Sequence, residues 1–123
     1  MTPRKPRPAK PGLPVRGSAT GRPVMALLDL LGRRWTLRII WELRGERMSF
    51  RALREACEEV SPSVLNTRLA ELREAGLVDW TEDGGYGLSS QGRRLSKLLQ
   101  PLNTWAEDWA RQGQAADGTD PEA

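Results

Sequence analysis

The chain has 123 residues and a mass of 13.7 kDa, with 38% hydrophobic and 28% charged residues, which suits one globular domain. It contains no histidine, which excludes Ser-His-Asp and Cys-His catalysis and histidine-containing zinc sites. Its one cysteine, Cys57, cannot form an internal disulfide, which fits a cytoplasmic protein. No apolar run approaches the roughly 20 residues of a membrane helix, and the N-terminus lacks a signal-peptide stretch.

The net charge of +3 is unevenly distributed along the chain. Residues 1–22 carry six basic residues, no acid and repeated prolines, whereas residues 24–112 are balanced and residues 113–123 carry three acids. Proline blocks helix, and sparse apolar residues cannot offset the entropy of ordering. We therefore predict a disordered basic arm over 1–22, a folded domain over 23–112 and a disordered acidic tail over 113–123. The arm favours a polyanionic partner, with a merely solvated tail as the alternative.

Two dense apolar segments open the folded part. Residues 24–31 are predicted to form a helix, and Gly32 interrupts the apolar run after it. A second helix is predicted from Trp35 to Leu43. Their apolar content exceeds that of a solvent-facing helix, so we expect them at the centre of the core or at an oligomer interface.

The middle of the chain predicts two further helices. Residues 48–50 fit an edge strand or the start of a helix, and residues 51–58 fit a short helix. Ser61 and Pro62 suit the N-cap and the first position of a helix that runs to Ala75, before Gly76. An apolar stripe lies on one face of this helix and a small polar face lies opposite. The stripe consists of Leu65, Leu69 and Leu72, and the opposite face of Ser63, Asn66, Thr67 and Ala70.

A hairpin and a long helix complete the predicted order. Residues 77–82 and 86–88 fit short strands joined by a glycine-rich turn. Ser89 or Ser90 then caps a terminal helix, in which Pro101 predicts a kink or a restart. This helix has an apolar stripe that ends in Trp105 and Trp109, which favours a partner helix. The whole order predicts a mostly helical (α+β) winged helix-turn-helix with additional terminal helices.

These residues also resemble the HxlR-type transcriptional regulators. The resemblance starts at residues 29–37 (DLLGRRWTL), which fit the family's opening motif. Further matches follow in the family's order: Phe50-x-x-Leu53, Val60-Ser61-Pro62-x-Val64-Leu65-x-x-Arg68-Leu69-x-x-Leu72, Glu74-Ala75-Gly76-Leu77-Val78 and Tyr86-x-Leu88-Ser89-x-x-Gly92. Each motif alone is unspecific, but the series in register covers about residues 23–110.

The resemblance implies a homodimeric regulator, expected to be a repressor, that binds palindromic operator DNA. It implies dimerisation through the two terminal helices, for which the candidate residues are Val24, Leu27, Leu28, Leu31, Leu98, Leu102, Trp105 and Trp109. Many members carry a Cys-Pro before the first helix, and in some that cysteine senses oxidants or electrophiles. Here Arg22-Pro23 occupies this place, so that response is not carried over, and Cys57 is expected to be a core residue.

The expected DNA contacts lie mainly on helix 61–75. Ser61, Ser63, Asn66 and Thr67 are candidates for base and phosphate contacts. Arg68 either reaches a phosphate or forms a salt bridge, and Arg51 and Arg54 either contact the backbone or are solvated. The candidate arm contacts to the DNA backbone are Arg4, Lys5, Arg7, Lys10 and Arg16. The hairpin carries Asp79, Glu82 and Asp83, which repel phosphate, so it contributes little or the arm replaces it.

The sequence leaves one other function open. A winged-helix adaptor that binds protein through its aromatic terminal helix is the alternative, and the acidic hairpin favours it. The sequence shows no phosphate loop, metal cluster or nucleophile–base pair, so we expect neither an enzyme nor a cofactor nor a metal. The sequence also leaves open a binding site for a small-molecule effector between the Trp35 helix and the terminal helix.

Overall fold

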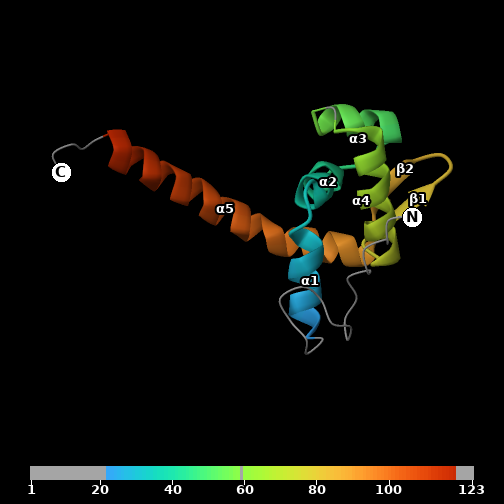
Figure 1. The fold of residues 1–123 in the computed structure, drawn as a ribbon, viewed down its shortest axis with the longest axis horizontal. Helices are drawn as coiled ribbons and strands as arrows, with labels where there is room; N and C mark the ends of the chain where they lie inside the picture. Colours follow the sequence, from blue (N-terminus) through green and yellow to red (C-terminus); the bar gives the residue numbers. More distant parts are fainter. Residues whose placement is uncertain (1–21, 59, 119–123) are drawn as a thin grey trace, which may run out of the picture. The chain divides into compact units, whose positions relative to one another are not determined.

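The computed structural model describes residues 22–58 and 60–118, with side chains to residue 114. The chain divides after Arg93 into two units. The first unit contains α1 to α4, the β1–β2 hairpin and the start of α5, and the second contains the rest of α5 (Figure 1). The predicted order of elements and the mostly helical winged helix-turn-helix fold are confirmed.

The first two helices lie where the apolar segments predicted them. Helix α1 spans Pro23–Leu31, and its proline occupies the first turn, where a helix needs no N–H at that position. Helix α2 spans Thr36–Leu43 and buries Ile39 and Ile40 almost completely. Before it, Trp35 has φ of 76°, a left-handed backbone conformation that residues other than glycine seldom adopt.

The next two helices form the helix-turn-helix. Helix α3 spans Phe50–Ala56, and helix α4 spans Pro62–Glu74. Each starts at a serine cap, because Ser49 Oγ accepts a hydrogen bond from the Ala52 N–H at 3.1 Å and Ser61 Oγ accepts one from the Val64 N–H at 3.2 Å. The predicted stripe is the buried face of α4: Leu65, Leu69 and Leu72 are at most 2% exposed. Burying this stripe turns the polar face of α4 outward.

The wing is a two-stranded antiparallel hairpin. Strand β1, Val78–Thr81, pairs with β2, Gly85–Leu88, in the register Val78 to Leu88 and Thr81 to Gly85. Met48 adds a short bridge to Tyr86 through hydrogen bonds of 2.9 and 2.8 Å. Residues 48–50 therefore do both things that the sequence predicted: Met48 extends the sheet edge and Phe50 begins α3.

Helix α5 spans Ser90–Gly118 without a break (Figure 1). Ser89 caps it, since its Oγ accepts a hydrogen bond from the Gly92 N–H at 3.0 Å. Pro101 lies inside the helix, so the predicted restart does not occur. The helix continues past residue 112, where the sequence predicted the folded domain to end, and residues 119–123 of the predicted tail lie outside the described residues.

Candidate nucleic-acid interface

The N-terminal end of α4 presents polar groups to solvent. Ser61, Pro62 and Ser63 are all exposed. The Ser63 N–H lies in the first turn, where no carbonyl of the helix is available to accept it. Exposed N–H groups at a helix N-terminus attract anionic oxygens, and a DNA phosphate is such a group.

The predicted DNA-facing residues share one exposed face of α4. Ser63, Asn66, Thr67 and Ala70 are exposed, while the leucines of the opposite face are buried. The side chains on this face are short, so a partner can approach the helix backbone closely. Asn66 is suited to read a base edge because its amide both donates and accepts hydrogen bonds.

Arg68 is engaged within the protein. Its Nε donates to the Arg34 carbonyl oxygen at 2.8 Å, and its Nη1 lies 3.0 Å from Glu71 Oε1. Of the two roles that the sequence predicted for Arg68, the structure shows the salt bridge.

A half-buried charge network fixes α4 to the start of the domain. The Arg33 guanidinium lies 2.9 Å from the Asp29 carboxylate on α1 and 3.0 Å from the Glu71 carboxylate on α4. The side chains of Arg33 and Glu71 are 12% and 15% exposed, so solvent screens their attraction weakly. Removing one partner leaves a charge in a largely dry site, which is costly. The network thus holds α4, which presents the polar face, against the segment that contains Asp29 and Arg33.

The two arginines of α3 differ in their surroundings. The Arg51 side chain is 90% exposed, and its Nε lies 3.5 Å from the Glu55 carboxylate, so it is accessible to a phosphate. Arg54 instead donates from Nε to the Val60 carbonyl oxygen at 2.8 Å. This bond ties α3 to the segment before α4 and gives Arg54 a structural role in the turn.

The wing is acidic, as its sequence indicates, but one of its acids is neutralised. Arg47 forms an ion pair with Asp79, and its side chain passes over the wing next to Gly84 and Gly87. Within residues 22–58 and 60–114, no ion pair engages Glu82 or Asp83. No cation among the described residues therefore pairs with the two carboxylates at the tip of the wing.

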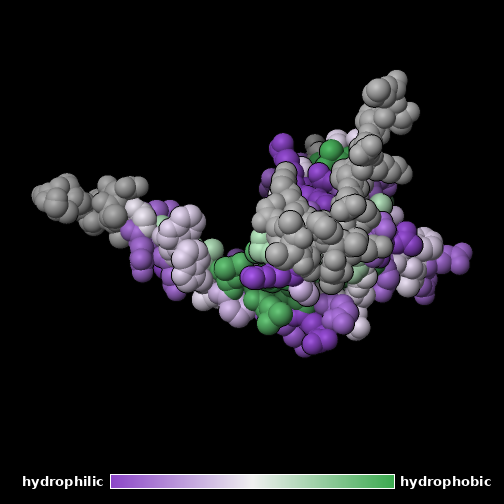
Figure 2. All heavy atoms as spheres, turned by 60° about the horizontal axis from the view of Figure 1, so that its bottom comes forward, coloured by the Kyte–Doolittle hydropathy of each residue, from purple (hydrophilic) through white to green (hydrophobic). Residues whose placement is uncertain are grey.

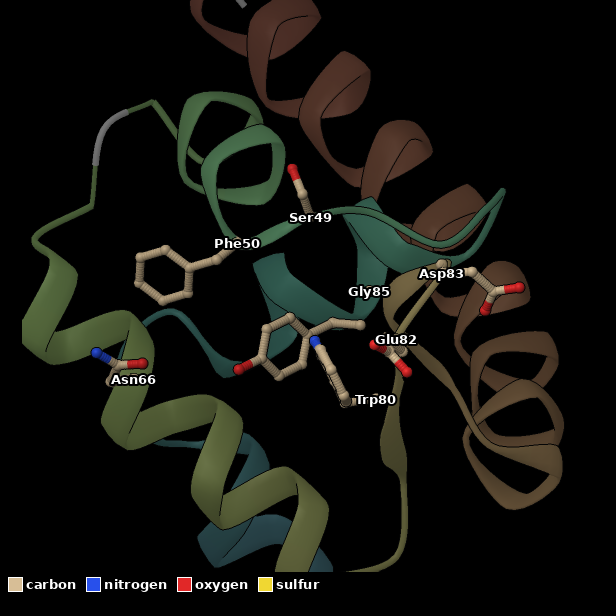
Figure 3. Close-up of a pocket in the computed structure, with 9 residues that line it drawn as sticks. Ser49, Phe50, Asn66, Trp80, Glu82, Asp83 and Gly85 are labelled. Carbon is tan, nitrogen blue, oxygen red and sulfur yellow. The ribbon is translucent and has the colours of Figure 1, made fainter.

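A cleft separates α4 from the wing. It has a volume of about 630 Å³ and is lined by Ser49, Phe50, Asn66, Trp80, Glu82, Asp83, Gly84, Gly85 and Tyr86. Figure 3 shows Asn66 on one side and Trp80 and Glu82 on the other. One wall thus includes the candidate base-reading residue, and the other combines aromatic rings with carboxylates.

Exposed apolar residues occur on α1 and, separately, on α5. On α1, Val24 and Leu28 are 56% and 55% exposed, and Leu27 and Leu31 are half-buried. On α5, the exposed residues are Leu98, Leu102, Trp105 and Trp109, whose spacing of four, three and four places them on one stripe. The two tryptophan rings stack with centroids 5.7 Å apart. Figure 2 shows hydrophobic residues, in green, at the surface.

Cys57 is a core residue. It is 0% exposed, and burial raises the pKa of its thiol against the smaller opposing effect of the Arg38 cation. In the part of the chain that the structure describes, no group of three acidic, cysteine or histidine residues is arranged to hold a metal ion. The described helices include none long and apolar enough to cross a membrane. The arm candidates Arg4, Lys5, Arg7, Lys10 and Arg16 lie outside the described residues.

The fold and this surface define the class of the protein. A helix-turn-helix with an exposed polar second helix, followed by a hairpin, is the architecture of winged helix-turn-helix DNA-binding proteins. The profile of the HxlR-like helix-turn-helix family matches residues 30–114, so the chain belongs to that family. The chain is therefore a DNA-binding transcriptional regulator and not an enzyme, as the sequence predicted.

Named relatives and solved structures agree with this assignment. The chain is 28% identical over 88 residues to the uncharacterized HTH-type transcriptional regulator YvaP of Bacillus subtilis, covering 67% of this chain and 82% of YvaP. It is 32% identical over 85 residues to YdzF of the same organism, covering 63% and 78%. The quinone-bound YodB of B. subtilis matches with a TM-score of 0.64 and 28% identity, covering 69% of this chain and 94% of YodB. A possible HxlR family factor from Thermoplasma volcanium matches with a TM-score of 0.61 and 28% identity, covering 69% and 82%.

The sequence did not predict the structural roles of three charged residues. Arg47, Arg33 and Glu71 each form an ion pair with a residue of another element. Arg33 belongs to the family's opening motif at residues 29–37, and this motif was the one sign in the sequence that Arg33 has a role. The partners are far apart in sequence, and spacing along the chain does not reveal such pairs.

Proposed function

We propose that the protein is a homodimeric repressor that reads a palindromic operator in the cytoplasm with helix α4. The observation that carries the proposal is the exposed polar face of α4 next to its capped N-terminus. In this arrangement Ser63, Asn66 and Thr67 contact base edges, and Ser61 and the first-turn N–H groups contact a phosphate. Arg51 contacts the backbone from α3, because it is the exposed arginine of that helix.

The exposed apolar faces support dimerisation. Leu98, Leu102, Trp105 and Trp109 follow the spacing of a helix that packs along a partner helix, and each is at least 55% exposed. Val24 and Leu28 on α1 expose a second apolar face, with Leu27 and Leu31 beside it. We assign both faces to contacts with a second copy of the chain, since exposed stripes of this kind mark interaction surfaces.

Sedimentation tests the dimer. Leu102→Glu places a charge within the α5 stripe and is expected to yield monomers, while the far-UV circular dichroism of the helices persists. Gln100→Glu adds the same charge outside the stripe and is the matched control. Monomeric wild-type protein, or a dimer that survives Leu102→Glu, contradicts this assignment.

The arm supplies positive charge that the wing lacks. Glu82 and Asp83 repel phosphates, and Asp79 is already paired with Arg47. Arg4, Lys5, Arg7, Lys10 and Arg16 are the cations of the arm, and we assign them to the DNA backbone. Contacts of this kind add affinity without adding sequence information.

We propose no thiol-based response to an effector. The solved YodB is quinone-bound, whereas the one cysteine of this chain is buried and its thiol pKa is raised. A non-covalent effector is compatible with the shallow hollow that Trp35 and Arg34 line beside Leu37.

The experiment that tests the proposal is in vitro selection from a random duplex library at near-physiological salt. The proposal predicts enrichment of a palindrome whose half-sites lie about one helical turn apart, roughly 10 base pairs. Two chains should bind each selected duplex. Placed over a promoter, that duplex should lower reporter expression when the protein is supplied. Binding without enrichment would show only non-specific attraction to phosphate and would contradict sequence-specific reading.

A further inference from the structure

The cleft between α4 and the wing combines two kinds of recognition chemistry. Trp80 is 49% exposed, and Phe50 and Tyr86 also line the cleft. Glu82 and Asp83 also line the cleft, and Figure 3 shows Glu82 beside Trp80. Grooves walled by aromatic rings bind proline-rich segments, and nearby carboxylates bind their cations. The cleft therefore suits a proline-rich cationic strand better than it suits phosphate.

The chain carries such a segment before the first helix. Prolines recur with three-residue spacing at positions 3 and 6 and at positions 8, 11 and 14. Polyproline II has three residues per turn, so in that conformation each of these series would form one ridge. Arg4, Arg7, Lys10 and Arg16 differ by multiples of three and would share the remaining ridge. In that conformation the segment presents proline on two sides and a row of cations on the third.

The segment also has the charge and the length that the cleft requires. Its cations complement Glu82 and Asp83, which have no ion-pair partner among the described residues. Residues 15–21 link the proline-rich residues 3–14 to Arg22, and at about 3.1 Å per residue they span about 22 Å. A compact unit of this size has a radius of gyration of about 11 Å, so this link spans about the width of the unit.

We propose that, in the protein free of DNA, residues 3–14 of the chain's own arm dock in the cleft between α4 and the wing. Prolines pack on Trp80 and Tyr86, and basic side chains pair with Glu82 and Asp83. Docking covers two exposed carboxylates and one exposed tryptophan with complementary groups. DNA phosphates then compete with the cleft for the same cations. The proposal is independent of sequence-specific reading, because it concerns the free protein.

Paramagnetic broadening in the full-length protein tests the docking. Ala9→Cys adds one thiol to the arm for a nitroxide label, while Cys57 is fully buried and escapes labelling. The indole signal of Trp80 and the amide signals of residues 82–86 are followed without DNA, with the label oxidised and then reduced. A tenfold dilution of labelled ¹⁵N protein into unlabelled protein separates broadening within one chain from broadening between copies. Trp105 and Trp109 serve as internal references, because they do not line the cleft.

The proposal predicts loss of the Trp80 indole signal under the oxidised label and its return on reduction. The loss should persist on dilution and disappear in Glu82→Gln/Asp83→Asn. Glu55→Gln/Glu107→Gln removes the same charge from exposed sites outside the cleft and should leave the loss intact. An unbroadened Trp80 overturns the proposal, as does broadening that both double variants leave unchanged. Broadening that vanishes on dilution assigns the arm to a second copy and overturns docking within one chain.

Discussion

Cys57 shows how burial decides the chemistry of a single residue. It is fully buried at the C-terminal end of α3, and burial raises the pKa of its thiol. The thiolate is the reactive form of cysteine, so both accessibility and ionisation oppose reaction. Its small apolar side chain fills the core at the base of the helix-turn-helix. The sequence predicted that Cys57 is a core residue, and its burial confirms this prediction.

Maleimide labelling followed by mass spectrometry checks this account of Cys57. In the folded protein we expect modification to be slower than in the unfolded chain by on the order of 100-fold, because reaction requires opening of the core. The free energy of unfolding should also fall in the alkaline range, where the exposed thiol of the unfolded chain ionises first. Because the thiol releases one proton, the free energy of unfolding falls by at most about 1.4 kcal/mol per pH unit. Cys57→Ala should lack this slope, and rapid native labelling would refute the buried thiol.

Gly85 is a second position whose surroundings determine the residue. Its φ is +77°, and a Cβ there would lie 2.5 Å from the Met48 carbonyl oxygen. Gly85→Ala is expected to lower the free energy of unfolding by about 2–4 kcal/mol through backbone strain and this clash. Gly45→Ala is the matched control, because nothing beyond its two chain neighbours lies within 4 Å of the added Cβ. Equal melting temperatures for the two variants would contradict the tight approach of Met48 to the wing.

At the level of elements, local patterns predicted the helices and hairpin because their causes are local. The Ser61–Pro62 start, the leucine spacing of α4 and the glycine-rich turn each act within a few residues. The polar face of the candidate site followed from that leucine spacing. The ion pairs of Arg47 with Asp79 and of Arg33 with Glu71 were not predictable, because they join positions far apart in sequence. The cleft was not predicted for the same reason, since α3, α4 and both strands of the wing line it.

The buried stripe of α4 makes a quantitative prediction. Leu69 is 2% exposed, so Leu69→Ala is expected to lower the free energy of unfolding by about 2–5 kcal/mol through reduced burial and a cavity. Leu37→Ala is the control, because Leu37 is 44% exposed and its truncation should cost less. Chemical denaturation of both variants provides the comparison. A Leu69→Ala protein as stable as the wild type would show that this face does not form the core.

For the whole molecule, charge is divided among separate parts. The arm is basic, the wing tip carries Glu82 and Asp83, and the polar face of α4 is uncharged at Ser63, Asn66 and Thr67. The proposed function therefore assigns affinity for phosphate to the arm and reading of the base sequence to α4. A long-range attraction from the arm would gather DNA, and short-range contacts of α4 would select the site.

Deleting residues 2–21 tests this division. We expect affinity for DNA to depend less steeply on salt, with the slope reduced by about 0.9 for each phosphate that the arm no longer neutralises. Preference for the operator over random DNA should change little, because the arm carries no base contacts in this account. Replacing the five arm cations with glutamine at unchanged length should reproduce the effect. An unchanged salt slope would mean that the arm never contacts DNA.

The central claim is that the exposed face of α4 reads the operator, and selection with an Asn66→Ala protein tests it most directly. We expect that this variant keeps its fold, as measured by circular dichroism, and selects the wild-type half-site with a relaxed preference at one base pair. Discrimination at that position should fall by about 1–3 kcal/mol. Asn103→Ala on α5, an exposed asparagine outside this face, should select the wild-type sequence unchanged. An Asn66→Ala protein that selects the same sequence with the same stringency would contradict the assignment of α4 residue 66 to the groove.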